Sequence, residues 1–184
     1  MALTPSNMIP LGTQAPDFTL PDTVSGSVYS LQQLKGDKAT VIMFICNHCP
    51  YVKHINPELV NLSNDYAARG VKFVAISSND VQTHPEDAPD KMKETALLLS
   101  YPFPYLFDET QQTAKAYDAA CTPDFYIFDE QLKLVYRGQL DDSRPSNKVP
   151  LSGKDIRAAL DCLLNGQPVS PYQRPSIGCG IKWK

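Results

Sequence analysis

Residues 44–54 read FICNHCPYVKH, and this stretch decides both the fold and the chemistry of the chain. The run over residues 39–45, ATVIMFI, is continuous and apolar, which is typical of a central strand covered on both faces. Further along, apolar side chains recur at spacings of four and three and predict one buried helix face: Ile55, Leu59, Leu62 and Tyr66. Cys46 and Cys49 therefore lie where a buried strand passes into a helix.

A second strand, residues 71–76 (VKFVAI), completes a strand–helix–strand unit with a right-handed crossover. Gly70 is predicted to end the helix as a left-handed cap. Pro57 lacks the N–H that an inner helical turn needs, so we expect a kink there or a second helix that starts near it.

The remaining segments extend this unit into an α/β domain with a central mixed sheet flanked by helices and preceded by a hairpin. The predicted strands cover residues 18–22, 27–31, 105–107, 124–128 and 132–137, and the predicted helices cover 89–99, 111–119 and 156–164.

The last of these helices has the clearest periodicity. Ser152 and Asp155 resemble a capping box at its start, and Gly166 is a stop signal. The segment after it is rich in proline and glycine, and we expect it to be loop. We divide the chain into an N-terminal segment (1–14), one domain (15–166) and a C-terminal tail (167–184).

Composition narrows the function. The chain has 184 residues and a formal net charge of −3, which is unlike the basic face of a nucleic-acid binder. It contains no apolar run long enough to cross a membrane, and its start lacks the basic and apolar parts of a signal peptide. The five cysteines are an odd number, which argues against a secreted disulfide framework. We therefore predict a cytoplasmic protein with no nucleic-acid or membrane partner.

Two cysteines three residues apart share one face of a helix, so their sulfur atoms can meet. The free N–H groups and partial positive charge of a helix start favour a thiolate. We expect Cys46 to open the helix, to be partly exposed and to attack a disulfide, while Cys49 lies one turn in and releases the product. The predicted substrate is a disulfide or dithiol, the electron donor is unidentified, and no cofactor or metal is predicted because the dithiol carries the electrons.

On these residues the chain resembles the thioredoxin-like superfamily, in the branch with peroxiredoxin-like proteins and thiol-disulfide oxidoreductases. The matching segments are APDFTL (15–20), CNHC (46–49) and Thr122-Pro123 before a strand. The segments CNHCPYVKH, CTPDFY, YRGQLDD and PSIGC are similar to a bacterial group described as thioredoxin family or AhpC/TSA family proteins.

The resemblance implies a thioredoxin-like fold and thiol-disulfide exchange by Cys46 and Cys49. It also implies a cis bond before Pro123, with the backbone N–H and C=O of Thr122 offered to a substrate strand. Oxidising members of the superfamily carry a histidine where this chain has His48. A cation at that position is expected to lower the pKa of Cys46 and to make the couple more oxidising.

One departure concerns the proton of Cys49. Thioredoxins carry a buried aspartate where this chain has Thr40, so the proton is expected to pass to Glu109, Asp124 or water. The other cysteines divide by position. Cys121, beside Thr122, and Cys179, between two glycines, are the candidates for a third redox thiol, and Cys162 is assigned to packing.

A peroxiredoxin-like thiol peroxidase is the first alternative. In that alignment Cys49 is the peroxidatic cysteine, but Ile42 and Pro123 stand where the family has a proline and an arginine.

A non-enzymatic copper-binding protein of the same fold is the second alternative. Cys46, Cys49 and either His48 or His54 would be its soft ligands, although copper-binding relatives space their cysteines further apart. A redox-inert domain that binds a partner is the third and least favoured, because both cysteines are present.

Overall fold

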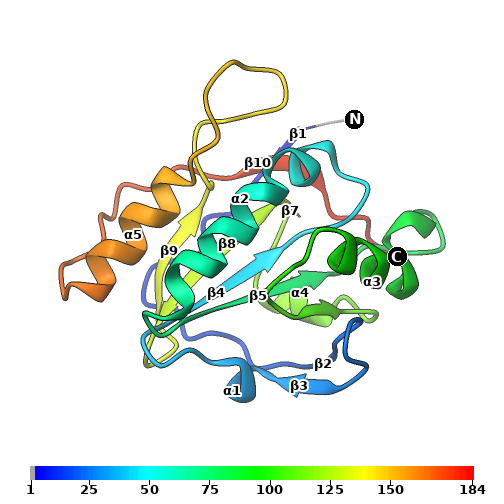
Figure 1. The fold of residues 1–184 in the computed structure, drawn as a ribbon, viewed down its shortest axis with the longest axis horizontal. Helices are drawn as coiled ribbons and strands as arrows, with labels where there is room; N and C mark the ends of the chain where they lie inside the picture. The colour runs from blue at the N-terminus through cyan, green and yellow to red at the C-terminus, as the bar shows by residue number, and fades with distance from the viewer. Residues whose placement is uncertain (1–2) are drawn as a thin grey trace.

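The computed structural model describes residues 3–184, and its centre is a five-stranded mixed sheet (Figure 1). The strand order is β6–β5–β4–β8–β9, with β4, β5 and β6 parallel and with β8 and β9 each antiparallel to its neighbour. The strands are β4 (Ala39–Phe44), β5 (Val71–Ser77), β6 (Tyr105–Phe107), β8 (Asp124–Asp129) and β9 (Leu134–Gly138). This confirms the predicted mixed sheet, and the predicted hairpin of residues 124–137 is β8 with β9.

The central strand β4 is buried along its whole length because both of its faces are covered. Alternate side chains enter two cores, with Val41 and Met43 in one and Ile42 and Phe44 in the other. The first core is covered by α2 (Pro50–Ala67), α3 (Pro89–Leu98) and α5 (Lys154–Leu164). Residues of α1 (Leu31–Leu34), α4 (Gln112–Ala116) and the N-terminal segment pack in or against the second core.

The predicted N-terminal hairpin is present as β2 (Thr19–Pro21) and β3 (Val28–Ser30), which pair in antiparallel register. It lies along one side of the main sheet in Figure 1. Ser30 then caps the short helix α1 in a capping box with Gln33.

Three helix predictions are corrected. One helix, α2, continues through Pro57, so the alternative of a second helix that starts there is wrong. The α5 helix begins after Gly153, which has a left-handed conformation and provides no side-chain cap. Ser152 does not form a capping box, because its N–H and hydroxyl donate to Asp141. The predicted helix over 111–119 is the shorter α4. At the end of α5, Gly166 adopts the left-handed conformation expected of a stop signal.

The prediction that the tail is loop is wrong for residues 177–180. They form β10 (Ile177–Gly180), the middle strand of a small antiparallel sheet with β1 (Leu3–Pro5) and β7 (Cys121–Thr122). Figure 1 shows β1 in blue beside β10 in red, at the end of the molecule where α2 begins. The N-terminal strand β1 and the C-terminal strand β10 therefore pair next to the CNHC segment.

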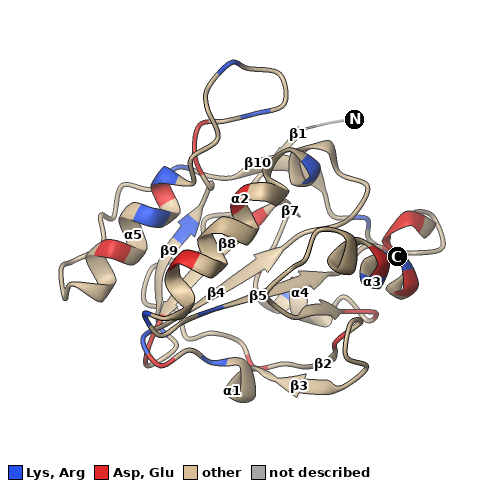
Figure 2. Ribbon diagram, viewed as in Figure 1, with Lys and Arg blue, Asp and Glu red and all other residues tan. Residues whose placement is uncertain are grey.

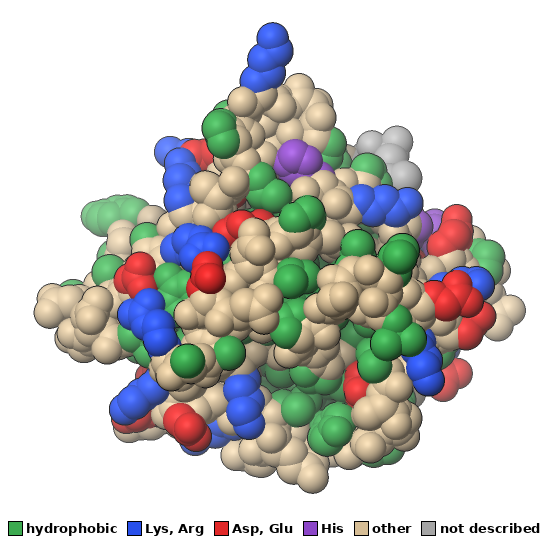
Figure 3. Space-filling view, viewed as in Figure 1, with side chains coloured by type: hydrophobic (Ala, Val, Ile, Leu, Met, Phe, Trp, Pro, Cys, Tyr) green, Lys and Arg blue, Asp and Glu red, His purple; other side chains and the backbone are tan. Residues whose placement is uncertain are grey.

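Charged side chains of both signs are mixed over α5 and α3 (Figure 2). Arg157 of α5 bridges to Glu58 and Asp65 of α2, at 2.7 Å and 2.8 Å, and so ties these two helices together. Hydrophobic side chains on the viewed face are interspersed with charged ones (Figure 3). Within residues 3–184, no helix is both long and apolar enough to cross a membrane.

Candidate active site

The CNHC segment is a loop between β4 and α2, not the first turn of a helix. The helix begins at Pro50, whose fixed backbone suits the first helical position, and Cys49 is the residue before it. Cys46 therefore does not open the helix, and it is only 1% exposed. The prediction of a partly exposed Cys46 is wrong because its side chain lies against Thr122 of β7 and close to Asp87.

Three sulfur atoms gather at this point. Cys46 Sγ lies 3.3 Å from the hydroxyl of Thr122, and Cys49 Sγ lies 3.2 Å from the carbonyl oxygen of the same residue. Cys179 Sγ lies 2.8 Å from Cys49 Sγ. The Thr122–Pro123 bond is cis, as predicted. All five cysteines of the chain are free thiols, and only Cys162 is not fully buried.

The expected free edge at Thr122 is not open in this structure. Thr122 is paired with Cys179, because β7 forms a ladder with the chain's own strand β10. The backbone that was predicted to receive a substrate strand therefore already has a partner.

The pKa values of Cys46 and Cys49 shift in opposite directions. A hydrogen bond from the Cys46 thiol lowers the pKa of Cys49. The Cys179 thiol and the N–H groups of Val52 and Cys179 act in the same direction, against the effect of burial. The hydrogen bond to Cys49, burial and the negative charge of Asp87 all raise the pKa of Cys46. The net shift of the Cys46 pKa is upward, and the expected lowering contribution of His48 stays a prediction.

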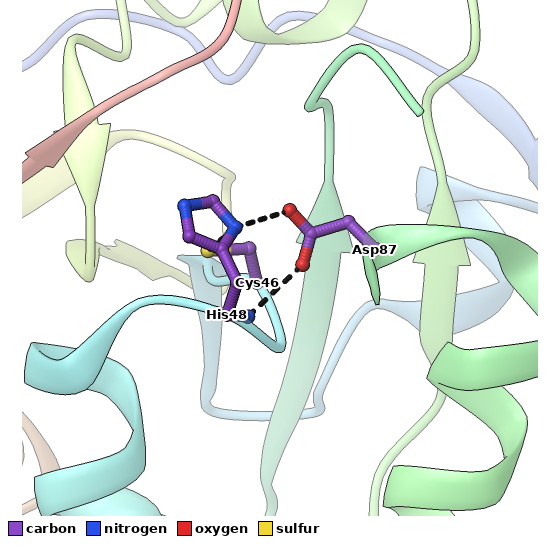
Figure 4. A group of neighbouring side chains, drawn as sticks. All are labelled: Cys46, His48 and Asp87. Atoms are coloured by element: carbon purple, nitrogen blue, oxygen red, sulfur yellow. Dashed lines mark hydrogen bonds and ion pairs between the residues drawn. The ribbon is translucent and has the colours of Figure 1, made fainter. Parts of the chain in front are cut away.

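Asp87 is the residue that sequence reasoning missed. It is fully buried at the end of η1 (Pro85–Asp87), and its carboxylate lies 2.6 Å from His48 Nδ1 (Figure 4). It also accepts the backbone N–H groups of Asn47 and His48 and the side-chain amide of Asn79. Burial tends to raise the pKa of Asp87, but these hydrogen bonds outweigh it and hold the pKa below its ordinary value. No local pattern around Asp87 reveals this long-range role.

His48 is held between this carboxylate and the first sulfur. Because an ionised carboxylate only accepts, His48 Nδ1 carries a proton toward Asp87, and Cys46 Sγ lies 3.7 Å from the same nitrogen. The charge of Asp87 raises the pKa of Cys46, which is opposite in direction to the effect predicted for His48.

The proposed proton acceptors differ in position. Glu109 is exposed, whereas Asp124 is fully buried and accepts hydrogen bonds from Ser6 and Tyr126. Burial raises the pKa of Asp124 to about 7, so it titrates near neutral pH, although the hydrogen bonds of its side chain go to Ser6 and Tyr126 and not to Cys49. Thr40 accepts a hydrogen bond from the Gly36 N–H, in the turn before β4.

The other predicted residues fall outside the sulfur cluster. Burial raises the pKa of Cys121, and its thiol points to the Pro123 carbonyl. Lys53 is exposed, and His54 lies 2.8 Å from the Ser143 hydroxyl. Of the two candidates for a third redox thiol, the structure brings only Cys179 into contact with Cys49.

A soft-metal site in this structure would have a different set of ligands from the one predicted. Ligand atoms of Cys46, His48 and Asp87 all lie within 4.8 Å of one another, so these three residues could share an ion. The set differs from the predicted one, because Asp87 joins it while His54 faces Ser143. An ion there would have to replace the proton between His48 and Asp87.

The mixed sheet, the loop before α2 and the cis-proline facing it define a thioredoxin-like protein. The chain is similar in fold alone to the thioredoxin domain of a thiol-disulfide oxidoreductase from Bacteroides vulgatus. The two share 19% identity over 74% of this chain and 90% of that one, with a TM-score of 0.60.

Residues 11–137 match the AhpC/TSA family, and the chain belongs to this family. It is 65% identical to an uncharacterized conserved protein from Geobacillus kaustophilus, over 100% of this chain and 97% of that one (TM-score 0.98). It is 47% identical to a hypothetical protein from Sinorhizobium meliloti, over 98% of each chain (TM-score 0.96). No curated protein matches the chain.

Proposed function

We propose that the protein is a thiol-disulfide oxidoreductase in which Cys46 and Cys49 alternate between dithiol and disulfide. The observation that carries the proposal is the position of both sulfurs beside the cis-proline: Cys46 Sγ lies 3.3 Å from the Thr122 hydroxyl, and Cys49 Sγ lies 3.2 Å from the Thr122 carbonyl oxygen. The pKa of Cys49 is lowered to about 5 while that of Cys46 is raised, which favours Cys49 as the thiol that ionises. Only a thiolate attacks a disulfide at a useful rate, so the pair is arranged for exchange.

The distribution of the proton reverses the order of attack expected from the sequence. The Cys49 thiolate attacks a substrate disulfide, forms a mixed disulfide and releases half of the substrate as a thiolate. The Cys46 thiol gives its proton to that leaving group, attacks Cys49 and releases the second half. The products are one Cys46–Cys49 disulfide, one substrate thiol and one substrate thiolate that takes its proton from water, and a dithiol donor returns both electrons to the protein. We place this cycle in the cytoplasm.

Trapping tests the proposal and the order of attack together. Oxidised glutathione is added to Cys49→Ser and to a double variant, Cys46→Ser with Cys179→Ser, because Cys179 also contacts Cys49. We expect the double variant to retain glutathione on Cys49, as measured by mass spectrometry of alkylated peptides. Capture only on Cys46 in Cys49→Ser would restore the sequence-based order. The exchange activity would be refuted if neither variant retained glutathione while iodoacetamide still alkylated Cys46 in Cys49→Ser and Cys49 in the double variant.

Peroxidase activity is the second candidate, and the burial of the site favours it. Cys46, Cys49 and Cys179 are each at most 2% exposed, so a small oxidant fits the closed site better than a protein disulfide does. The Cys49 thiolate would attack one peroxide oxygen to form a sulfenic acid, and a neighbouring thiol would then expel water to form a disulfide. Turnover of hydrogen peroxide faster than that of oxidised glutathione would establish this activity as the main one.

Metal analysis tests the remaining alternative, a non-enzymatic metal-binding protein. Protein purified under reducing conditions is expected to carry no stoichiometric metal. One equivalent of copper or zinc that is lost in Asp87→Asn would instead assign Cys46, His48 and Asp87 to a metal site.

A further inference from the structure

The strand β10 is fixed in place at both of its edges. It pairs with β1 in the register Leu3 to Cys179 and Pro5 to Ile177, and with β7 in the register Cys179 to Thr122. Cys179 is only 2% exposed. Its position therefore belongs to the folded core and not to a loose tail.

The segments on either side of β10 are fastened as well. Before the strand, the Ser176 hydroxyl donates to the Pro123 carbonyl, and the Ser6 N–H donates to the Ser176 carbonyl. After the strand, the Lys182 N–H donates to Asn79, and the Lys182 carbonyl accepts from the Asp80 N–H. These bonds fix the distance at which Cys179 meets the CNHC loop.

Gly178 allows this close approach. A Cβ atom on Gly178 would lie 1.9 Å from the Thr122 carbonyl oxygen, so any larger residue would push the two strands apart. The requirement for glycine here comes from contact, because the position does not need a left-handed backbone.

Cys49 consequently lies between two thiols. One is Cys46, three residues earlier in the same loop, and the other is Cys179, whose Sγ is 2.8 Å from Cys49 Sγ. A disulfide between residues 49 and 179 requires the two sulfurs to move closer by less than about 1 Å, given an S–S bond of about 2.05 Å. The Cys46 and Cys179 thiols approach the same sulfur from different segments of the chain.

We propose that Cys179 is a second resolving thiol for Cys49, so that the centre contains three redox cysteines instead of two. The inference rests on the proposed exchange activity. After Cys49 has formed a mixed disulfide, the Cys179 sulfur attacks Cys49, the Cys49–Cys179 bond forms, and the substrate sulfur leaves with the Cys179 proton. The substrate disulfide is the oxidant, and two protein thiols supply the two electrons. Cys46 remains a thiol throughout this branch.

The Cys49–Cys179 disulfide would also link β10 covalently to the start of α2. The Cys46–Cys49 disulfide lies within one loop and leaves β10 attached only by hydrogen bonds. The two oxidised forms therefore differ in how firmly the C-terminal strand is held.

Disulfide mapping of the full chain tests the inference. Wild type, Cys46→Ser, Cys179→Ser and Cys162→Ser are each treated with oxidised glutathione, quenched in acid, alkylated and digested. Cys162 is half-buried on α5 and serves as the matched control. We expect Cys46→Ser to lose two free thiols and to yield a peptide pair joined through Cys49 and Cys179. Cys162→Ser is expected to match wild type.

The variants separate the failure of the inference from the failure of the proposed function. Cys46→Ser that keeps glutathione on Cys49 while Cys179 stays free would overturn the inference and support the exchange activity. In Cys179→Ser, Cys49 can pair only with Cys46. If the Cys46–Cys49 disulfide does not form in this variant, the proposed function is refuted. Far-ultraviolet circular dichroism verifies folding, and Cys46→Ala replaces Cys46→Ser if the serine variant does not fold.

Discussion

Replacing Gly178 with alanine is the most direct perturbation of the contact between β10 and Thr122. The new Cβ would lie 1.9 Å from the Thr122 carbonyl oxygen and 2.7 Å from its carbonyl carbon. Close carbon–oxygen contacts in proteins begin near 3.3 Å, so the strands must separate by about 1.4 Å. Overpacking of this kind costs about 1–3 kcal/mol of unfolding free energy.

The matched control lies two residues away on the same strand. A Cβ on Gly180 would make one tight contact, with the Thr4 hydroxyl oxygen at 3.0 Å, and that side chain can rotate. We therefore expect Gly180→Ala to change the unfolding free energy less than Gly178→Ala does. Urea denaturation in reducing buffer measures both variants without any contribution from a disulfide.

The same pair of variants tests the redox consequence. A misplacement of about 1 Å between reacting groups can slow a reaction about a hundredfold. In a Cys46→Ser background, Gly178→Ala is expected to slow formation of the Cys49–Cys179 disulfide by about tenfold or more, while Gly180→Ala is not. Equal stability and equal rates in the two variants would refute the reasoning that Thr122 positions β10.

Three further predictions address the surroundings of the site. Asp87→Asn removes a negative charge that raises the pKa of Cys46, so the Cys46 thiolate absorbance, recorded with Cys49 replaced by serine, should appear at lower pH. Burial raises the pKa of Asp124 from 3.8 to about 7. Between pH 4 and pH 7, Asp124 is therefore protonated in the folded chain and ionised in the unfolded chain. Unfolding free energy should thus fall by up to about 4 kcal/mol from pH 4 to pH 7, and Asp124→Asn should remove the slope. Arg157→Ala leaves the buried Glu58 without its ion-pair partner. Because Arg157 is partly exposed, we expect the unfolding free energy measured by urea denaturation to fall by about 1–3 kcal/mol. Adding Glu58→Gln should recover most of this loss.

Local patterns predicted most of the main sheet because its elements carry their own signals. The buried run before Cys46 has the composition of a central strand, and α5 has an uninterrupted apolar stripe. Thr122-Pro123 was recognised only in combination with the two cysteines, since a proline alone marks an ordinary turn. These features depend on residues that are close together in the sequence.

The missed features depend on residues that are far apart. The strand β10 exists because Ile177–Gly180 pairs with Leu3–Pro5 and with Cys121–Thr122, and its own composition of glycine and cysteine resembles a loop. Asp87 lies 39 positions from His48, and nothing in its local sequence points to an imidazole. The burial of Cys46 follows from these same contacts, which explains why its exposure was predicted incorrectly.

The arrangement of the two chain ends has a consequence for access to the sulfurs. Cys49 is completely buried, and β10, which lies against it, is a four-residue strand covered on its outer edge by the three residues of β1. Short strands of a small sheet are among the parts of a fold that open at a low free-energy cost. A protein disulfide would therefore reach Cys49 by displacing β1 and β10, whereas a peroxide would not need this opening. Deleting residues 1–5 should accordingly increase the rate of exchange with a protein disulfide more than the rate with hydrogen peroxide. Equal changes in the two rates would show that the terminal strands do not control access.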